Sequence, residues 1–132
     1  MDEILYASDR YFTVFDFLIS HGQLLIRSSK SGEFGENIDI IFFNVNFQQL
    51  STYCKRLTIR RASLPTTSVK SKAVADFLVG EENYLFEIES NNEKYYIAAS
   101  FFKVYENRLE FHETSLGVIE YMGREIEIAS SM

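Results

Sequence analysis

NYLFEIESNNEKYYIAASFFKVY, from Asn83 to Tyr105, sets the fold class of this chain. Aromatic and β-branched residues dominate both halves of it, and such side chains fit the pleated surface of a strand. The dipeptide Asn91–Asn92 between the halves suits a tight turn, since asparagine tolerates positive φ. We therefore predict a hairpin with strands at Asn83–Ser90 and Lys94–Tyr105.

The segments on both sides of this hairpin continue the β pattern. Tyr11–Ser20, a His-Gly turn and Gln23–Ser29 predict a second hairpin. Ile38–Val45 is apolar on both faces, as expected of a central strand that is covered on both sides. Further strands are predicted at Lys55–Arg61, at Asn107–Glu113 and in a last hairpin over Val118–Ser130.

Two segments carry helix signals. Residues 8–21 could form a helix that Ser8 caps and Gly22 ends, but strong helix formers are scarce there, so the strand is favoured. Ala73–Val79 is the better helix candidate, with Ser71 as its cap and Gly80 at its end. The sequence thus predicts one mainly-β domain over residues 1–132. We expect an antiparallel β-sandwich or barrel of about eight to ten short strands, with one short helix near residues 73–79.

Composition indicates whether the chain folds and in which cellular compartment it is expected. The 132 residues are 46% hydrophobic and 15% aromatic, which is enough to fill a core and excludes a disordered chain. No secretory signal is visible, and the longest apolar run, Ile40–Phe43, is far shorter than a membrane span. Cys54 is the only cysteine, so no internal disulfide can form. These features predict a cytoplasmic protein.

The charge is distributed unevenly along the chain. Residues 55–72, here called the basic island, hold six basic residues and no acidic one. Residues 1–54 have a net charge of −4 and residues 73–132 a net charge of −8, which together with the island gives the total of −6.

Five glutamates in the acidic second half are candidate partner-binding residues: Glu87, Glu89, Glu110, Glu125 and Glu127. Each alternates with apolar residues and is expected to project to solvent from a predicted strand. If their strands are neighbours, the carboxylates form one negative sheet face. That face would either keep the protein soluble or meet a basic partner.

The basic island has several interpretations. Arg56 and Arg60 are expected on the exposed face of their strand, and with Arg61 they complete the candidate binding residues. RRASL fits a basophilic kinase pattern with Ser63 as the phosphate acceptor. Nucleic acid is disfavoured, because no aromatic residues are interleaved and the whole chain repels a polyanion. The island could instead lie against the acidic strands of its own fold.

Catalytic and metal-binding patterns are weak. His21, Cys54 and His112 are the only imidazole and thiol groups, and no paired ligand spacing links them. A Cys-His pair would require the fold to bring them together, whereas a lone cysteine in such a run is more often buried. No phosphate-binding glycine loop occurs. We predict no metal and no cofactor.

Aromatic residues crowd one region: Tyr95, Tyr96, Phe101, Phe102 and Tyr105. They could line a ligand pocket at a barrel mouth, but core packing is the favoured interpretation.

We expect a non-catalytic, intracellular protein-interaction module that binds a protein partner. One concrete version is an acidic protein that neutralises a basic target, such as a toxin or nuclease. The alternative is a small-ligand-binding β-barrel, and an enzyme of unknown class is third. Membrane association is not expected, and the oligomeric state is left open.

Overall fold

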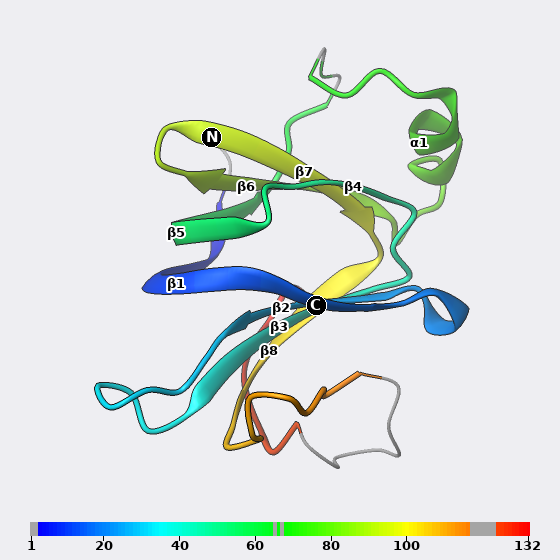
Figure 1. Cartoon of the computed structure of the whole chain (residues 1–132). Helices are drawn as coiled ribbons and strands as arrows, with labels where there is room; N and C mark the ends of the chain where they lie inside the picture. The colour runs from blue at the N-terminus through cyan, green and yellow to red at the C-terminus, as the bar shows by residue number, and fades with distance from the viewer. Residues whose placement is uncertain (1–2, 65, 67, 117–123) are drawn as a thin grey trace.

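The structure is a computed structural model that describes residues 3–64, 66, 68–116 and 124–132. Over these residues the protein is mainly β, as predicted, with nine strands and one short α-helix (Figure 1). The elements in chain order are β1 (Ile4–Leu18), the 3-10 turn η1 (Ile19–His21), β2 (Gln23–Ser28), β3 (Asn37–Phe43), β4 (Phe47–Gln49), β5 (Tyr53–Arg61), α1 (Lys72–Phe77), β6 (Tyr84–Ser90), β7 (Glu93–Ala99), β8 (Phe101–Asn107) and β9 (Ile126–Ser130).

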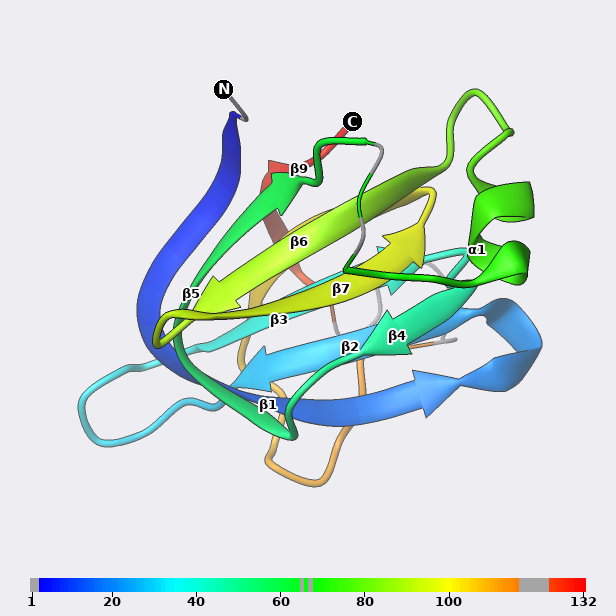
Figure 2. The same ribbon diagram turned by 90° about the horizontal axis from the view of Figure 1, so that it is seen from above.

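All nine strands form one antiparallel sheet, in the order β4-β7-β6-β5-β1-β2-β3-β8-β9. The chain runs from β3 into β4 and from β7 into β8. Residues 37–49 and 93–107 therefore pair twice, as β4 with β7 at one end of this order and as β3 with β8 next to β9 at the other. The sheet is therefore folded over, with β5, β6 and β7 in one layer and β2, β3 and β8 in the other (Figures 1 and 2). The hydrogen-bonded ladder stops between Phe43 and Phe47, where Asn44 has a φ of 56°, and the sheet is not closed. The fold thus combines the layers of a sandwich with one barrel-like sheet.

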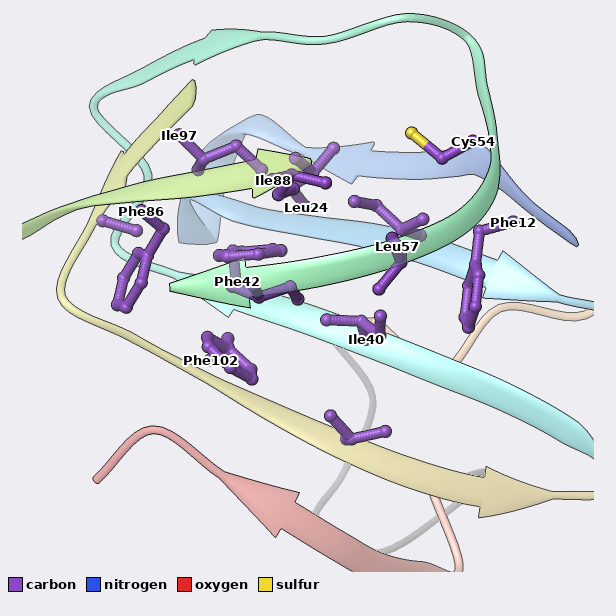
Figure 3. Close-up of a cluster of buried hydrophobic side chains, with 14 of the residues drawn as sticks. Phe12, Leu24, Ile40, Phe42, Cys54, Leu57, Phe86, Ile88, Ile97 and Phe102 are labelled. Atoms are coloured by element: carbon purple, nitrogen blue, oxygen red, sulfur yellow. The ribbon is translucent and has the colours of Figure 1, made fainter. Parts of the chain in front are cut away.

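The main core lies between the two layers. Phe42 of β3, Phe86 of β6 and Phe102 of β8 are fully buried, and their ring centroids are 5.3–5.7 Å apart (Figure 3). Aliphatic side chains from six strands surround them, including Leu24, Ile40, Leu57, Ile59, Ile88 and Ile97. Because the three rings come from both layers, burial of this cluster holds the sheet in its folded shape.

The outer face of each layer is partly covered as well. Val74 of α1 packs with Leu85 of β6 and Tyr96 of β7. On the other layer, Leu116 packs with Leu25 and Ile41, at the end of a segment that follows β8. β3 is accordingly buried on both faces, as predicted for Ile38–Val45. Among the described residues, no helix has the length and apolarity needed to cross a bilayer.

Several local predictions are confirmed. β1 occupies most of residues 8–21, so the helical alternative is wrong there, and Gly22 ends the following turn with a φ of 59°. Asn91 and Asn92 both have positive φ, at 52° and 65°, as the predicted tight turn requires. α1 lies where a helix is predicted, and the Ser71 hydroxyl accepts a hydrogen bond from Val74 N at 3.3 Å.

Two predicted strands differ from the structure. Lys94–Tyr105 is split at Ser100, whose backbone N donates to Phe43 O as the chain passes from one layer to the other. Asn107–Glu113 is not a strand, because β8 ends at Asn107. Of the last predicted hairpin, the second strand is β9, whereas residues 118–123 lie outside the described residues.

Side chains replace the sheet ladder along the segment after β8. Arg27 Nη1 donates to Glu113 O at 2.6 Å, and Lys30 Nζ donates to Arg108 O at 2.9 Å. The Asn37 amide donates to Leu109 O at 2.9 Å. These backbone oxygens are thereby hydrogen-bonded without a neighbouring strand. This explains why residues 108–113 lie outside the sheet although their sequence alternates like that of a strand.

Candidate functional site

The predicted acidic surface on β6 is neutralised by its neighbours. Glu87 and Glu89 project from the outer face of β6, beside Arg60 of β5 and Lys94 of β7. Arg60 lies 2.9 Å from Glu89 and 3.8 Å from Glu87, and Lys94 lies 3.8 Å from Glu87. Two carboxylates and two cations cancel, so this surface has no net charge. The basic island therefore does contact the acidic strands of its own fold, through Arg60.

The other glutamates lie elsewhere. Glu125 precedes β9 and Glu127 lies on it. Since β9 pairs with β8 and not with β6, these two glutamates and those of β6 do not lie on neighbouring strands. Lys103 lies 3.2 Å from Glu127. Glu110 lies in the segment after β8, where Lys30 approaches it to 2.7 Å, and this hydrogen bond and charge lower the pKa of Glu110.

Some cations of the basic island have partners within the fold, and others form no ion pair there. Arg61 donates to Ser131 O at 2.8 Å and stacks on Tyr84, and Lys72 pairs with Asp76 on α1. By contrast, Lys55 and Arg56 form no ion pair within the part of the chain that the structure describes. Ser63 is exposed just beyond β5, and its phosphorylation stays a prediction.

An exposed pair of stacked tyrosines lies next to Lys55 and Arg56. The rings of Tyr11 on β1 and Tyr53 on β5 are 5.5 Å apart and 19° from parallel, and about half of each residue is exposed. Tyr11 lies directly opposite Lys55 in the β1–β5 ladder, and Arg56 follows at a bulge with a φ of 62°. Tyr11, Tyr53, Lys55 and Arg56 are here called the tyrosine patch. The sequence prediction missed both tyrosines.

On the side of Tyr11, the tyrosine patch borders a loop that other side chains hold in place. A cavity of about 390 Å³ borders Tyr11, and Phe34 of the β2–β3 loop forms another part of its wall. Arg10 fixes this loop by donating to the backbone oxygens of Ser28 and Glu36 at 3.2 and 2.8 Å. Its guanidinium also stacks on Phe34, 4.1 Å from the ring centroid. The aromatic wall beside Tyr11 is thus positioned before any partner arrives.

A buried charge pair has a structural explanation instead of a catalytic one. Arg27 contacts both carboxylate oxygens of Asp39, at 2.7 and 2.9 Å, and both side chains are fully buried. Asn107 and Ser115 also donate to the Asp39 carboxylate, at 2.8 and 2.7 Å. With its acceptor sites occupied by protein groups, the carboxylate lacks the access to substrate that a general base needs. The cluster joins β2, β3 and β8 to the segment that covers them.

The candidate nucleophile and bases are not brought together. His21 and His112 are exposed, and His21 forms its hydrogen bond with the neighbouring Ser20 hydroxyl. Cys54 is buried in the main core. Among the described residues, no group of three or more His, Cys, Asp or Glu side chains is placed to hold a metal ion.

The Cys54 thiol is expected to be unreactive in the folded protein. Burial raises its pKa, and only a contact with Ser90 opposes this effect. Reaction of Cys54 with iodoacetamide at pH 8 should be at least about 1000-fold slower in the native protein than in urea, since it requires unfolding. Labelling at equal rates in both states would show that the thiol is accessible.

The raised pKa also makes stability depend on pH. The folded state keeps the proton that the unfolded thiol releases, so this contribution to stability is complete below the ordinary thiol pKa. It declines as the pH rises past that value toward the higher folded pKa.

The predicted aromatic cluster is distributed over separate parts of the fold. Phe102 lies in the main core and Tyr95 packs against it, whereas Tyr96 lies under α1 and Tyr105 under the segment after β8. Phe101 stacks on Phe43, with 4.6 Å between ring centroids. The five rings therefore do not line one pocket.

No protein-family model, curated protein or solved structure matches this chain.

Proposed function

We propose that this chain is a non-catalytic, intracellular protein-interaction module whose contact surface is the tyrosine patch. The observation that carries the proposal is the stacked, half-exposed pair of Tyr11 and Tyr53 beside two cations that have no acidic partner in the described residues. Tyrosine and arginine are among the residues that dominate the energy of protein interfaces. The lone cysteine and the absence of any disulfide fit a reducing compartment.

The chemistry of the patch specifies the partner. Aromatic rings on paired strands lose little conformational freedom on binding, so a partner surface can cover them at low entropic cost. Lys55 and Arg56 then favour a partner that carries carboxylates next to an apolar area. Such pairing accelerates association and weakens as salt is added.

This surface differs from the acidic surface of a neutralising protein. Such a protein would need free carboxylates to face a basic target, but Arg60 and Lys94 already occupy those on β6. Glu127 on β9 is likewise paired, with Lys103 at 3.2 Å. The tyrosine patch has the opposite charge, so the two versions predict opposite partners.

The proposal can be tested by quantitative affinity capture from lysate of the source organism at low and high salt. Wild-type protein is compared with Tyr11→Ser/Tyr53→Ser, with Glu87→Gln/Glu89→Gln and with Val79→Ser. Val79 is a matched control because it is an apolar residue that is 82% exposed, next to α1. Circular dichroism verifies that each variant is folded.

We expect wild type to capture an acidic protein. The variants Val79→Ser and Glu87→Gln/Glu89→Gln should capture it as well, whereas Tyr11→Ser/Tyr53→Ser should not. High salt should reduce its recovery. Recovery that depends on the glutamates and not on the tyrosines would overturn the proposal in favour of the neutralising version. The absence of any protein that distinguishes wild type from the tyrosine variant would overturn it as well.

A further inference from the structure

A second surface cavity lies away from the tyrosine patch, where the folded sheet opens at one end. Its volume is about 600 Å³, within the range of small-molecule sites. Arg61 at the end of β5, Tyr84 at the start of β6 and Phe101 at the start of β8 contribute to its wall. Ser100, where the chain passes from β7 to β8, also borders the cavity.

Arg61 is held in one orientation at this cavity. Its guanidinium lies 4.2 Å from the centroid of the Tyr84 ring, and Nη2 donates to Ser131 O at 2.8 Å. No carboxylate pairs with it among the residues that the structure describes. The contact with Tyr84 and the bond to Ser131 O hold the guanidinium before a ligand binds, and its other N–H groups can donate to that ligand.

The rest of the wall combines aromatic and polar side chains. Phe101 is held against Phe43, and Tyr84 packs toward Phe86 of the core at 6.1 Å. Between them, the Ser100 hydroxyl donates to Asn83 Oδ1 at 2.8 Å, and the Asn83 amide donates to Phe77 O at 2.9 Å. These polar groups already have protein partners, so the charged groups of Arg61 and Glu82 are left to discriminate between ligands, and Arg61 is the one that attracts an anion.

We infer that this cavity binds a small aromatic monocarboxylate. A carboxylate matches the donor geometry of Arg61, and a flat apolar body fits beside Tyr84 and Phe101. Glu82 also borders the cavity, and its negative charge disfavours ligands with a second anionic group. The site is independent of the tyrosine patch.

The probe for this inference is 2-naphthoate, titrated into isotopically labelled protein and followed by amide chemical shifts. We expect saturable shifts at Tyr84, Ser100 and Phe101 with a dissociation constant of about 1 mM or lower, a modest affinity for a ligand of this size. Arg61→Gln should weaken binding at least about 10-fold, as expected for a lost charged hydrogen bond. Arg108→Gln, at an exposed arginine after β8 that lines neither this cavity nor the tyrosine patch, is the matched control and should bind as wild type does.

Two further ligands keep the inference falsifiable with wild-type protein alone. 2-Naphthalenemethanol has the same rings without the charge, and naphthalene-2,6-dicarboxylate adds a second carboxylate. Both should bind at least about 10-fold more weakly than 2-naphthoate. Equal binding of the neutral alcohol, equal binding by Arg61→Gln, or no saturable shift at this cavity would overturn the inference.

Discussion

Asp39→Ala is expected to lower the free energy of unfolding by about 3–5 kcal/mol, the usual effect of removing one member of a buried ion pair. The substitution leaves the guanidinium of Arg27 fully buried without its counter-charge. It also removes the acceptor for the Asn107 amide and the Ser115 hydroxyl. Urea unfolding followed by circular dichroism measures the change.

A double variant separates the ion pair from simple loss of packing. Arg27→Met/Asp39→Leu removes both charges and keeps apolar volume, so it should be more stable than Asp39→Ala. Asp76→Ala is the matched control, because its partner Lys72 is exposed on α1 and the pair contributes little. A loss below about 1 kcal/mol for Asp39→Ala would contradict the buried pair, since that is an ordinary value for any substitution.

Phe86→Ala is expected to lower the free energy of unfolding by about 3–5 kcal/mol, as for other large-to-small changes of buried aromatic residues. Phe86 is fully buried, and its ring contacts Phe42 and Phe102 across the two layers of the sheet. The cavity that remains would therefore remove packing from both layers. Urea unfolding again provides the measurement, and Phe86→Leu should lose less because it keeps more of the volume.

Phe111→Ala is the control for this change, because it deletes the same side chain at a position that is 78% exposed. Its unfolding free energy should stay within about 0.5 kcal/mol of wild type. Similar losses at Phe86 and Phe111 would contradict a core that lies between the layers.

The sequence predicts much of the fold because local signals and burial agree along most strands. Leu57 and Ile59 alternate with outward residues on β5, and both are buried. Asn91 and Asn92 place the turn between β6 and β7 correctly, since few residues tolerate their positive φ. Each of these features depends on residues close together in the chain.

The features that sequence reasoning missed depend on contacts distant in the chain. The break at Ser100 has no turn residue of its own, and it follows from pairing with Phe43 across the sheet. The segment after β8 alternates like a strand, yet side chains from β2 and β3 hold its backbone. Neither set of partners can be identified from an isolated segment.

The two tyrosines of the patch were missed because of a bulge. Cys54 and Leu57 are both buried although they are three residues apart, since the bulge at Arg56 shifts the alternation of β5. Alternation extended back from Leu57 would place Lys55 in the core, whereas it lies outside with Tyr53. Pairing with β1 then stacks Tyr53 on Tyr11, a contact that spans 42 residues of sequence. The relative positions of the candidate glutamates likewise could not be predicted without the strand order.

The most direct measurement for the proposed function is the dissociation constant of the captured partner for wild type and for Tyr11→Ser/Tyr53→Ser. If the stacked tyrosines form the centre of the interface, the variant should bind at least about 30-fold more weakly, the effect of losing one interface hot spot. Val79→Ser should bind as wild type does. An unchanged constant for the folded tyrosine variant would contradict the proposal that this patch is the contact surface.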